Sequence, residues 1–138
     1  MNGNRVTLIT LGVSDLDRSK AYYTALGFNA EDGPPSVVFY RCGALYFGLY
    51  PLPDLAAEQN REAGQLGNGA MSLSQNYPDR AGVDMAYARA IDAGAKALSA
   101  PQETHWGGYS GYLADPDGHV WEYAHNPFWP LDDEGYLE

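Results

Sequence analysis

Residues 111–122 read Gly-Tyr-Leu-Ala-Asp-Pro-Asp-Gly-His-Val-Trp-Glu, and they say more about the fold than any other part of the chain. The segment Asp115-Pro116-Asp117-Gly118 has the composition of a tight turn. The aromatic and apolar residues around it predict one strand from Tyr109 to Ala114 and another from His119 to His125. We therefore expect two strands joined by a tight turn near the end of the chain.

A strand, a helix and a further strand are expected upstream of this pair. The predicted elements are a strand over Ala70–Asn76, a helix over Asp79–Ala93 and a strand over Lys96–Ser99. Apolar residues recur at helical spacing through the helix, and Gly94 supplies its stop. The second half of the chain therefore has the order βαβββ.

The first half shows the same order. Val6–Val13 predicts a strand, and Ser14 offers an N-cap oxygen for a helix that runs over Asp15–Leu26 and stops at Gly27. Three short strands are expected to follow, at Phe28–Ala30, Ser36–Tyr40 and Ala44–Tyr50. The chain thus contains the same unit twice.

The repeat predicts an α+β fold in a single domain of residues 1–138. Its parts are a first βαβββ module (1–50), a linker (51–69), a second βαβββ module (70–126) and an acidic C-terminal tail (127–138). Each module alone would leave one face of its sheet uncovered, so the two are expected to associate. With helices on one face, the opposite faces would form a curved mixed sheet around a central cup.

Composition narrows the functional classes. The chain has 18 acidic and 8 basic residues, a formal net charge of −10, so nucleic acid is not expected as a partner. The single cysteine excludes an internal disulfide framework and a multi-cysteine metal site. No apolar stretch is long enough to cross a membrane, and the first residues do not resemble a signal peptide, so we expect a cytoplasmic protein.

The sequence resembles the vicinal-oxygen-chelate superfamily of glyoxalase I, extradiol dioxygenases, and fosfomycin- and bleomycin-resistance proteins. The first signature is the segment from Leu11 to Ser19 that leads into Tyr22-Tyr23 and Leu26-Gly27-Phe28. The second is Gly111–Glu122. The resemblance covers nearly the whole chain up to about Asn126, and it implies a cup lined by alternate residues of the inner strands.

In metal-dependent members of the superfamily, a divalent ion in the cup is held by side chains from several strands. The resemblance places Glu122 at the last-strand ligand position. The first-strand ligand position falls on Leu8, the fifth-strand position falls near Ala70, and Ala44–Tyr50 contains no acid. Because a catalytic site normally needs three protein ligands, we predict no metal and no other cofactor. The alternative is a divalent metal held by Glu122 with His105 from a nearby loop.

Strand alternation identifies the side chains that would line the cup. Counting by twos along the strands selects polar residues, and Gly107-Gly108 would let the neighbouring Trp106 cover a planar or apolar ligand. The predicted ligand-binding residues are Thr10, Ser72, Asn76, Trp106, Ser110, Tyr112 and Glu122. By the same alternation, Trp121 and Tyr123 are expected to pack under the helices.

Two interpretations of Glu122 stay open. It is either a structural residue that forms hydrogen bonds with neighbouring strands or Tyr112, or a functional carboxylate that acts as a general base or orients a ligand. The first function we predict is therefore metal-free binding of a small organic molecule. The second is a glyoxalase-type lyase or isomerase with Glu122 as catalytic base. The third is a dimeric scaffold with a collapsed pocket.

A homodimer is expected in each case. Superfamily members usually dimerise, and Phe128 and Trp129, between Pro127 and Pro130, would pin the tail to the body or to a partner subunit.

Overall fold

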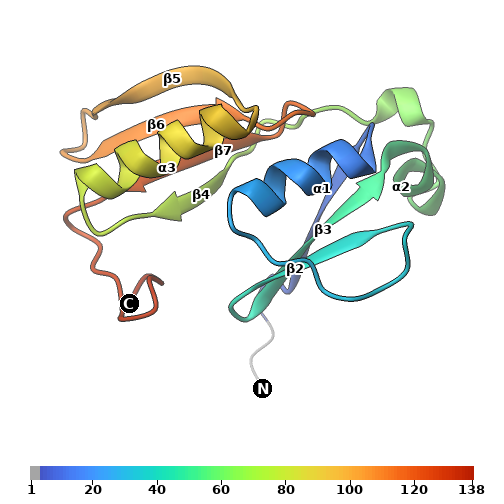
Figure 1. The fold of residues 1–138 in the computed structure, drawn as a ribbon, viewed down its shortest axis with the longest axis horizontal. Coiled ribbons are helices and arrows are strands. Elements are labelled where there is room, and N and C mark those ends of the chain that lie inside the picture. The colour runs from blue at the N-terminus through green and yellow to red at the C-terminus, as the bar shows by residue number, and fades with distance from the viewer. Residues whose placement is uncertain (1–3) are drawn as a thin grey trace. The chain divides into compact units, whose positions relative to one another are not determined.

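The structure, a computed structural model, describes residues 4–138 and divides into two compact units, the first ending at Gly67 and the second beginning at Asn68 (Figure 1). Each unit has one mixed sheet, of three strands in the first and four in the second. The α+β class and the pattern of two strand-helix-strand modules are therefore confirmed. None of the helices in the described residues is long and apolar enough to cross a membrane.

The first unit begins with a strand, a helix and two further strands. Its elements are β1 (Leu8–Val13), α1 (Leu16–Ala25), β2 (Val38–Cys42), β3 (Leu45–Pro51), α2 (Leu52–Glu58) and a short 3₁₀ turn η1 (Ala63–Gln65). The strand order is β1-β3-β2, with β3 parallel to β1 and antiparallel to β2. Aromatic rings fill the core of this unit: Tyr23 lies 5.2 Å from Phe47, and Tyr40 stacks on Phe47 at 4.9 Å, measured between centroids.

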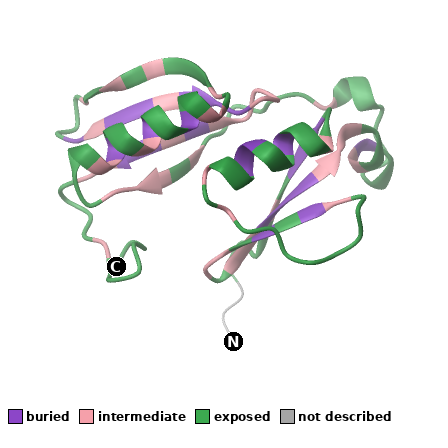
Figure 2. Ribbon diagram, viewed as in Figure 1, coloured by how far each residue is buried: buried purple, intermediate pink, exposed green. Residues whose placement is uncertain are grey.

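The second unit has the full βαβββ order. Its elements are β4 (Leu73–Asn76), α3 (Arg80–Ala93), β5 (Lys96–Glu103), β6 (Tyr109–Ala114) and β7 (Val120–His125). The strand order is β4-β7-β6-β5, so the last two strands of the chain lie at the centre of the sheet. Figure 2 shows that buried residues gather on β6 and β7, whereas the edge strand β5 is largely exposed.

Three expectations about local structure were wrong. Phe28–Ala30 is not a strand, because only Ala30 pairs, through an isolated bridge to Tyr40. The N-cap of α1 is Asp15, whose carboxylate accepts the Arg18 backbone N–H at 3.0 Å, and not Ser14. β4 begins at Leu73, so Ser72 precedes the strand instead of lying within it.

Candidate functional site

The two faces of the second sheet differ in chemistry. Tyr109 points toward α3, since its hydroxyl donates a hydrogen bond to the Asp84 carboxylate on that helix at 2.7 Å. Leu113 lies on the same side by strand alternation and is fully buried. Trp121, paired directly with Leu113 in the ladder, is buried too. The face that α3 covers is therefore apolar around Leu113 and Trp121. Glu122 and Tyr112 project from the other face, which we call the open face of the second sheet.

Glu122 lies in the middle of a polar row across this open face. Ser74 on β4 and Tyr112 on β6 are its direct neighbours in the two adjoining strands. Ser74 Oγ donates to Glu122 Oε1 at 2.8 Å, and the Tyr112 hydroxyl donates to Oε2 at 3.2 Å. Ser99 on β5 continues the row beyond Tyr112. Each carboxylate oxygen is therefore held by a hydroxyl from a different strand.

The electrostatics of the row favour the neutral form of the Tyr112 phenol. Burial raises the pKa of Tyr112, and both the charge of Glu122 and the hydrogen bond to it act in the same direction. Tyr112 therefore remains a hydrogen-bond donor at neutral pH. Among residues 4–138, Glu122 has no ion pair with a basic side chain.

A second polar row runs beside the first. Asn76 on β4 and Ser110 on β6 lie on the same face as Glu122, separated by Ala124 on β7, and Gln102 on β5 extends the row. Ser110 is buried, whereas Asn76 is half-buried. The structure thus brings four of the predicted residues onto one face: Asn76, Ser110, Tyr112 and Glu122.

The residues around Glu122 do not fit a divalent metal. Its contacts in adjoining strands are the hydroxyls of Ser74 and Tyr112, and metal sites of this kind need several carboxylate, imidazole or thiolate ligands. Within the described part of the chain, no group of three or more His, Cys, Asp or Glu side chains could share an ion. His125 directs Nδ1 to the backbone oxygen of Tyr77, at 3.0 Å.

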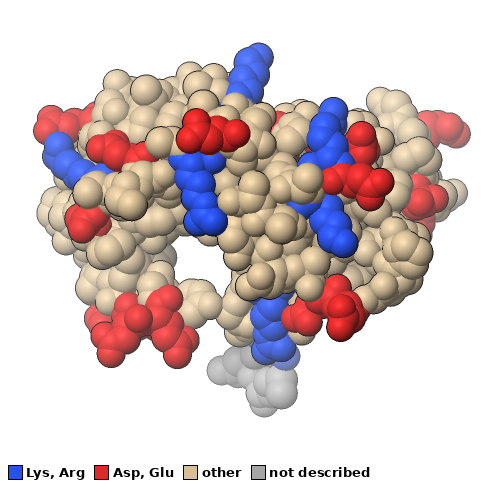
Figure 3. All heavy atoms as spheres, viewed as in Figure 1, with Lys and Arg blue, Asp and Glu red and all other residues tan. Residues whose placement is uncertain are grey.

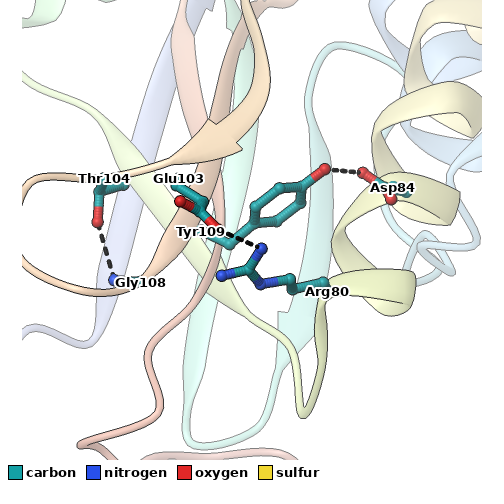
Figure 4. Close-up of polar contacts among 6 residues, drawn as sticks. All are labelled: Arg80, Asp84, Glu103, Thr104, Gly108 and Tyr109. Carbon is teal, nitrogen blue, oxygen red and sulfur yellow. Dashed lines mark hydrogen bonds and ion pairs between the residues drawn. The ribbon is translucent and has the colours of Figure 1, made fainter.

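The loop that carries His105 and Trp106 is a closed turn between β5 and β6. Gly108 N donates to Thr104 Oγ1 at 3.0 Å (Figure 4). Thr104 N donates to the Gly108 oxygen, also at 3.0 Å. Gly107 has a φ of +90°, and a Cβ on Gly108 would lie 1.8 Å from the Trp106 ring. The glycines therefore let the backbone turn and the indole fold back on its own loop. That Trp106 covers a ligand stays a prediction.

His105 is exposed in the same loop. Across the described residues no hydrogen bond or ion pair joins it to Glu122. A metal shared by these two side chains stays an alternative that no contact in the structure supports.

A cluster of charged and aromatic side chains fixes the base of this loop against α3. Arg80, at the start of α3, lies 5.0 Å above the ring centroid of Tyr109 and forms an ion pair with Glu103 at 3.0 Å. Asp84, one turn further along the helix, accepts the Tyr109 hydroxyl, and this hydrogen bond raises the pKa of Tyr109 (Figure 4). Because these groups lie on the α3 face, they position β6 and take no part in the open face.

Thr10 belongs to the first unit. It is exposed on β1 and pairs with Gly48 of β3, on the face away from α1. Alternation on β1 places the buried residues Leu11 and Val13 on the opposite face. The predicted phase of this strand is therefore consistent with the structure, and the role of Thr10 in ligand binding stays a prediction.

Sequence comparison assigns the chain to a superfamily. The model of the glyoxalase/bleomycin resistance protein/dioxygenase superfamily matches residues 5–123. The chain belongs to this superfamily. A search of curated proteins found no match.

Solved structures of superfamily proteins share the fold. A glyoxalase-related enzyme from Fulvimarina pelagi is 30% identical, with a TM-score of 0.90 over 98% of this chain and 97% of that one. A glyoxalase/bleomycin resistance protein/dioxygenase family enzyme from Burkholderia phytofirmans PsJN is 21% identical, with a TM-score of 0.77 over 86% and 96%. Lactoylglutathione lyase from Agrobacterium tumefaciens is 22% identical, with a TM-score of 0.70 over 95% and 100%. The last two likenesses concern the fold alone.

Sequence reasoning did not select two residues of the Glu122 row. Ser74 had the correct strand phase, yet only the structure shows that its hydroxyl binds the carboxylate directly. Ser99 was missed because the strand was expected to end there, whereas β5 continues to Glu103. Strand alternation places Ser74 on the correct face, but its place opposite Glu122 follows only from the pairing of β4 with β7 in the structure.

Proposed function

We propose that the protein binds a small organic molecule on the open face of the second sheet, without a metal ion, and that Glu122 is the acceptor that orients it. The observation that carries this proposal is the double hydrogen bonding of Glu122 by Ser74 and Tyr112. A carboxylate has about four lone-pair positions, and two donors leave the others available to a ligand. The two hydroxyls fix the direction of the carboxylate before a ligand arrives, which lowers the entropic cost of binding.

The polar rows also indicate the kind of ligand that would fit. Ser74, Ser110 and Asn76 supply neutral donors and acceptors, and Glu122 supplies the only charge on the two rows. A ligand with a hydroxyl, amide or amine donor would therefore match Glu122, whereas an anionic group placed there would be repelled.

A second candidate is a lyase or isomerase in which Glu122 removes a proton from the substrate. The 30% identity to the glyoxalase-related enzyme from Fulvimarina pelagi favours this candidate. In that reaction, Glu122 would accept the proton and Tyr112 would remain a neutral donor to the carboxylate. Against it stands the geometry, because both carboxylate oxygens already accept a hydrogen bond, an arrangement that suits a group that orients a ligand.

Metal analysis combined with ligand screening tests the proposal. The purified protein would be analysed by mass spectrometry for zinc, iron, nickel and manganese. It would then be screened by thermal shift against bleomycin and small carbonyl compounds. The proposal is supported if a compound binds saturably and chelators leave its affinity unchanged. Glu122→Gln should then weaken this binding about tenfold. Glu134→Gln, a substitution of the same kind in the tail, is the matched control.

Two results would contradict the metal-free proposal. Stoichiometric, tightly bound metal in the purified protein would refute it directly. Turnover in the lactoylglutathione lyase reaction that Glu122→Gln abolishes would favour the enzyme instead. We also propose that the protein acts in the cytoplasm as a homodimer, a state that the exposed aromatic residues of the tail support.

A further inference from the structure

An asparagine-glycine pair begins the second unit. Asn68 and Gly69 are both exposed, in a stretch of backbone that forms neither helix nor strand. In such a pair the backbone nitrogen of the second residue can attack the side-chain amide of the first, because glycine has no Cβ to hinder the approach. Asn68 is the only asparagine followed by glycine among residues 4–138. The others are Asn4, Asn29, Asn60, Asn76 and Asn126.

The backbone N–H of Gly69 is available as the attacking group. Within the described residues, no hydrogen bond engages it. After Asn76, by contrast, the Tyr77 N–H is held by the Ala124 oxygen at 2.7 Å. The residue after Asn126 is a proline, which has no N–H. Both the residue type and the backbone hydrogen bonding therefore single out the step from 68 to 69.

The Asn68 side chain joins the linker to the turn that precedes β7. Its Nδ2 donates to the backbone oxygen of Asp117 at 3.3 Å. The amide also packs against Gly118, where an added Cβ would collide with Nδ2. The hydrogen bond is longer than the usual range of about 2.7–3.2 Å, and it is exposed, so brief local openings release the amide. The intact amide thus holds the turn, yet it can still reach the Gly69 nitrogen.

We propose that Asn68-Gly69 is a site of spontaneous deamidation in the folded protein. The Gly69 nitrogen attacks Asn68 Cγ and forms a new C–N bond. The bond from Cγ to Nδ2 breaks, and the departing amide group takes the Gly69 proton and leaves as ammonia. Water, the only co-reactant, then opens the five-membered succinimide at either carbonyl carbon to give aspartate or isoaspartate. The reacting groups belong to adjacent residues, and this proximity raises their effective concentration.

Deamidation turns the contact with Asp117 from attraction into repulsion. The new carboxylate is ionised at neutral pH and has no N–H to donate to the Asp117 oxygen. It adds a negative charge to a chain whose net charge is already −10, with acidic side chains on both units and a group of them in the tail (Figure 3). The modified linker therefore releases the turn at 115–118. This site goes beyond the proposed function, because it uses none of the residues around Glu122.

Ageing of the purified full chain tests the reaction. The protein would be incubated at mildly alkaline pH, and its peptides would be mapped by mass spectrometry with electron-transfer fragmentation, which distinguishes aspartate from isoaspartate. Among the asparagines of residues 4–138, we expect Asn68 to be modified first, with both products present. Mapping must resolve single peptides, because Asn2-Gly3 contains the same pair of residues.

Two glycine variants on either side of Asn68 provide a matched control. Neither Gly67 nor Gly69 has a positive φ, and an added Cβ would meet nothing at Gly67 and only Met71 Cγ, at 3.9 Å, at Gly69. Gly69→Ala hinders the attacking nitrogen and should slow modification of Asn68 about tenfold, which is a barrier increase of about 1.4 kcal/mol. Gly67→Ala leaves that nitrogen unhindered and should keep the rate within about twofold.

A permanent aspartate tests the release of the turn. Asn68→Asp should speed hydrogen exchange of the Gly118 and His119 amides about fivefold, since the turn loses a hydrogen bond and gains a repulsive charge. Asn29→Asp adds the same charge at an exposed position of the first unit and should leave this exchange unchanged.

Three results would overturn the proposal. The first is an Asn68 that stays intact while Asn29 or Asn60 is modified. The second is equal ageing of Gly69→Ala and Gly67→Ala, which would show that the Gly69 nitrogen is not the attacking group. The third is unchanged exchange of the turn amides in Asn68→Asp, which would show that the modified linker does not release the turn.

Discussion

The position of Glu122 depends on a single buried acid in the preceding turn. Asp115 is almost fully buried, and its Oδ1 accepts the backbone N–H groups of Asp117 and His119, both at 2.9 Å. Gly118 closes the turn with a φ of +88°, a conformation that favours glycine. Because the turn sets the register of the β6–β7 hairpin, it also decides that Tyr112 lies opposite Glu122.

Removing the Tyr112 hydroxyl tests the Glu122 row. Tyr112→Phe should lower the free energy of unfolding by about 1 kcal/mol, because a hydrogen bond to a charged acceptor is lost at a half-buried position. The measurement is urea unfolding of wild type, Tyr112→Phe, Glu122→Gln and the double variant. We expect a coupling energy of at least about 0.5 kcal/mol between the two sites. Fully additive effects would show that the 3.2 Å contact does not stabilise the protein.

Single residues also show how far the sequence could predict the site. The turn residues at 115–118 and the strand at Tyr109–Ala114 follow from composition, because local chemistry alone determines them. Ser74 could be placed on the correct face by alternation. Its partner could not be predicted, because the pairing of β4 with β7 joins segments 48 residues apart in sequence.

At the scale of elements, the two long helices begin in the same way. Asp15 caps α1 by accepting the Arg18 N–H at 3.0 Å, and Asp79 caps α3 by accepting the Gly82 N–H at 2.7 Å. The sequence predicted helices in the right places, but favoured Ser14 as the first cap. Ser14 and Asp15 are both good cap residues, and only the backbone angles decide between them. Asp15 has the extended angles of a cap, with φ −138° and ψ 101°.

Alanine substitutions distinguish the two caps of α1. Asp15→Ala should lower the free energy of unfolding by about 1 kcal/mol, since a backbone donor at the helix end loses its acceptor. Ser14→Ala removes the exposed hydrogen bond that Ser14 Oγ accepts from Arg18, and it should cost at most about 0.5 kcal/mol. Chemical denaturation of both variants measures the difference. The reverse order of the two effects would restore Ser14 as the cap.

Strand β7 contributes the buried phenol of Tyr123, which should make the protein less stable at alkaline pH. Burial raises the pKa of Tyr123 to about 12, and Arg89 offsets part of this effect. Its ring contacts Tyr77, whose pKa is also raised by burial. Above pH ~10 the unfolded chain releases the Tyr123 proton whereas the folded chain keeps it, so stability is lost between about pH 10 and 12.

The expected loss from Tyr123 alone is about 2–3 kcal/mol by pH ~12. Tyr123→Phe should reduce the decline, while Tyr136→Phe, at an exposed tail position, should not. Urea unfolding at several pH values between neutral and strongly alkaline measures both. If the wild type and Tyr123→Phe lost stability in parallel, the Tyr123 phenol would not be the cause.

The end of the edge strand β5 could not be predicted from the sequence. β5 was expected to end at Ser99, yet it continues through Pro101 to Glu103. Two register shifts let the strand pass the proline, and Gly111 gives it room, since a Cβ there would lie 2.9 Å from Pro101 N. These adjustments depend on the neighbouring strand β6 and leave no local signal in β5.

At the scale of the whole molecule, the exposed aromatic residues of the C-terminal tail bear on whether the protein forms oligomers. Phe128 is 69% exposed and Trp129 is 58% exposed, so these large apolar side chains are not buried within one chain. The tail has its own fold: Asp132 Oδ1 accepts the backbone N–H groups of Glu134 and Tyr136, and Leu131 bridges to Leu137. A tail that is ordered and exposes aromatic residues offers an apolar surface to a second copy.

We therefore predict a homodimer that buries Phe128 and Trp129. Each copy carries a net charge of −10, so repulsion opposes assembly and added salt should strengthen the dimer. Sedimentation equilibrium at low and high sodium chloride concentration measures this. Phe128→Ser/Trp129→Ser should shift the population to the 15.0 kDa monomer, whereas Met85→Ser, at a residue 74% exposed on α3, should not. A monomer mass for the wild type at micromolar concentration and high salt would refute the prediction, because screening would have removed the repulsion and apolar burial would still not suffice.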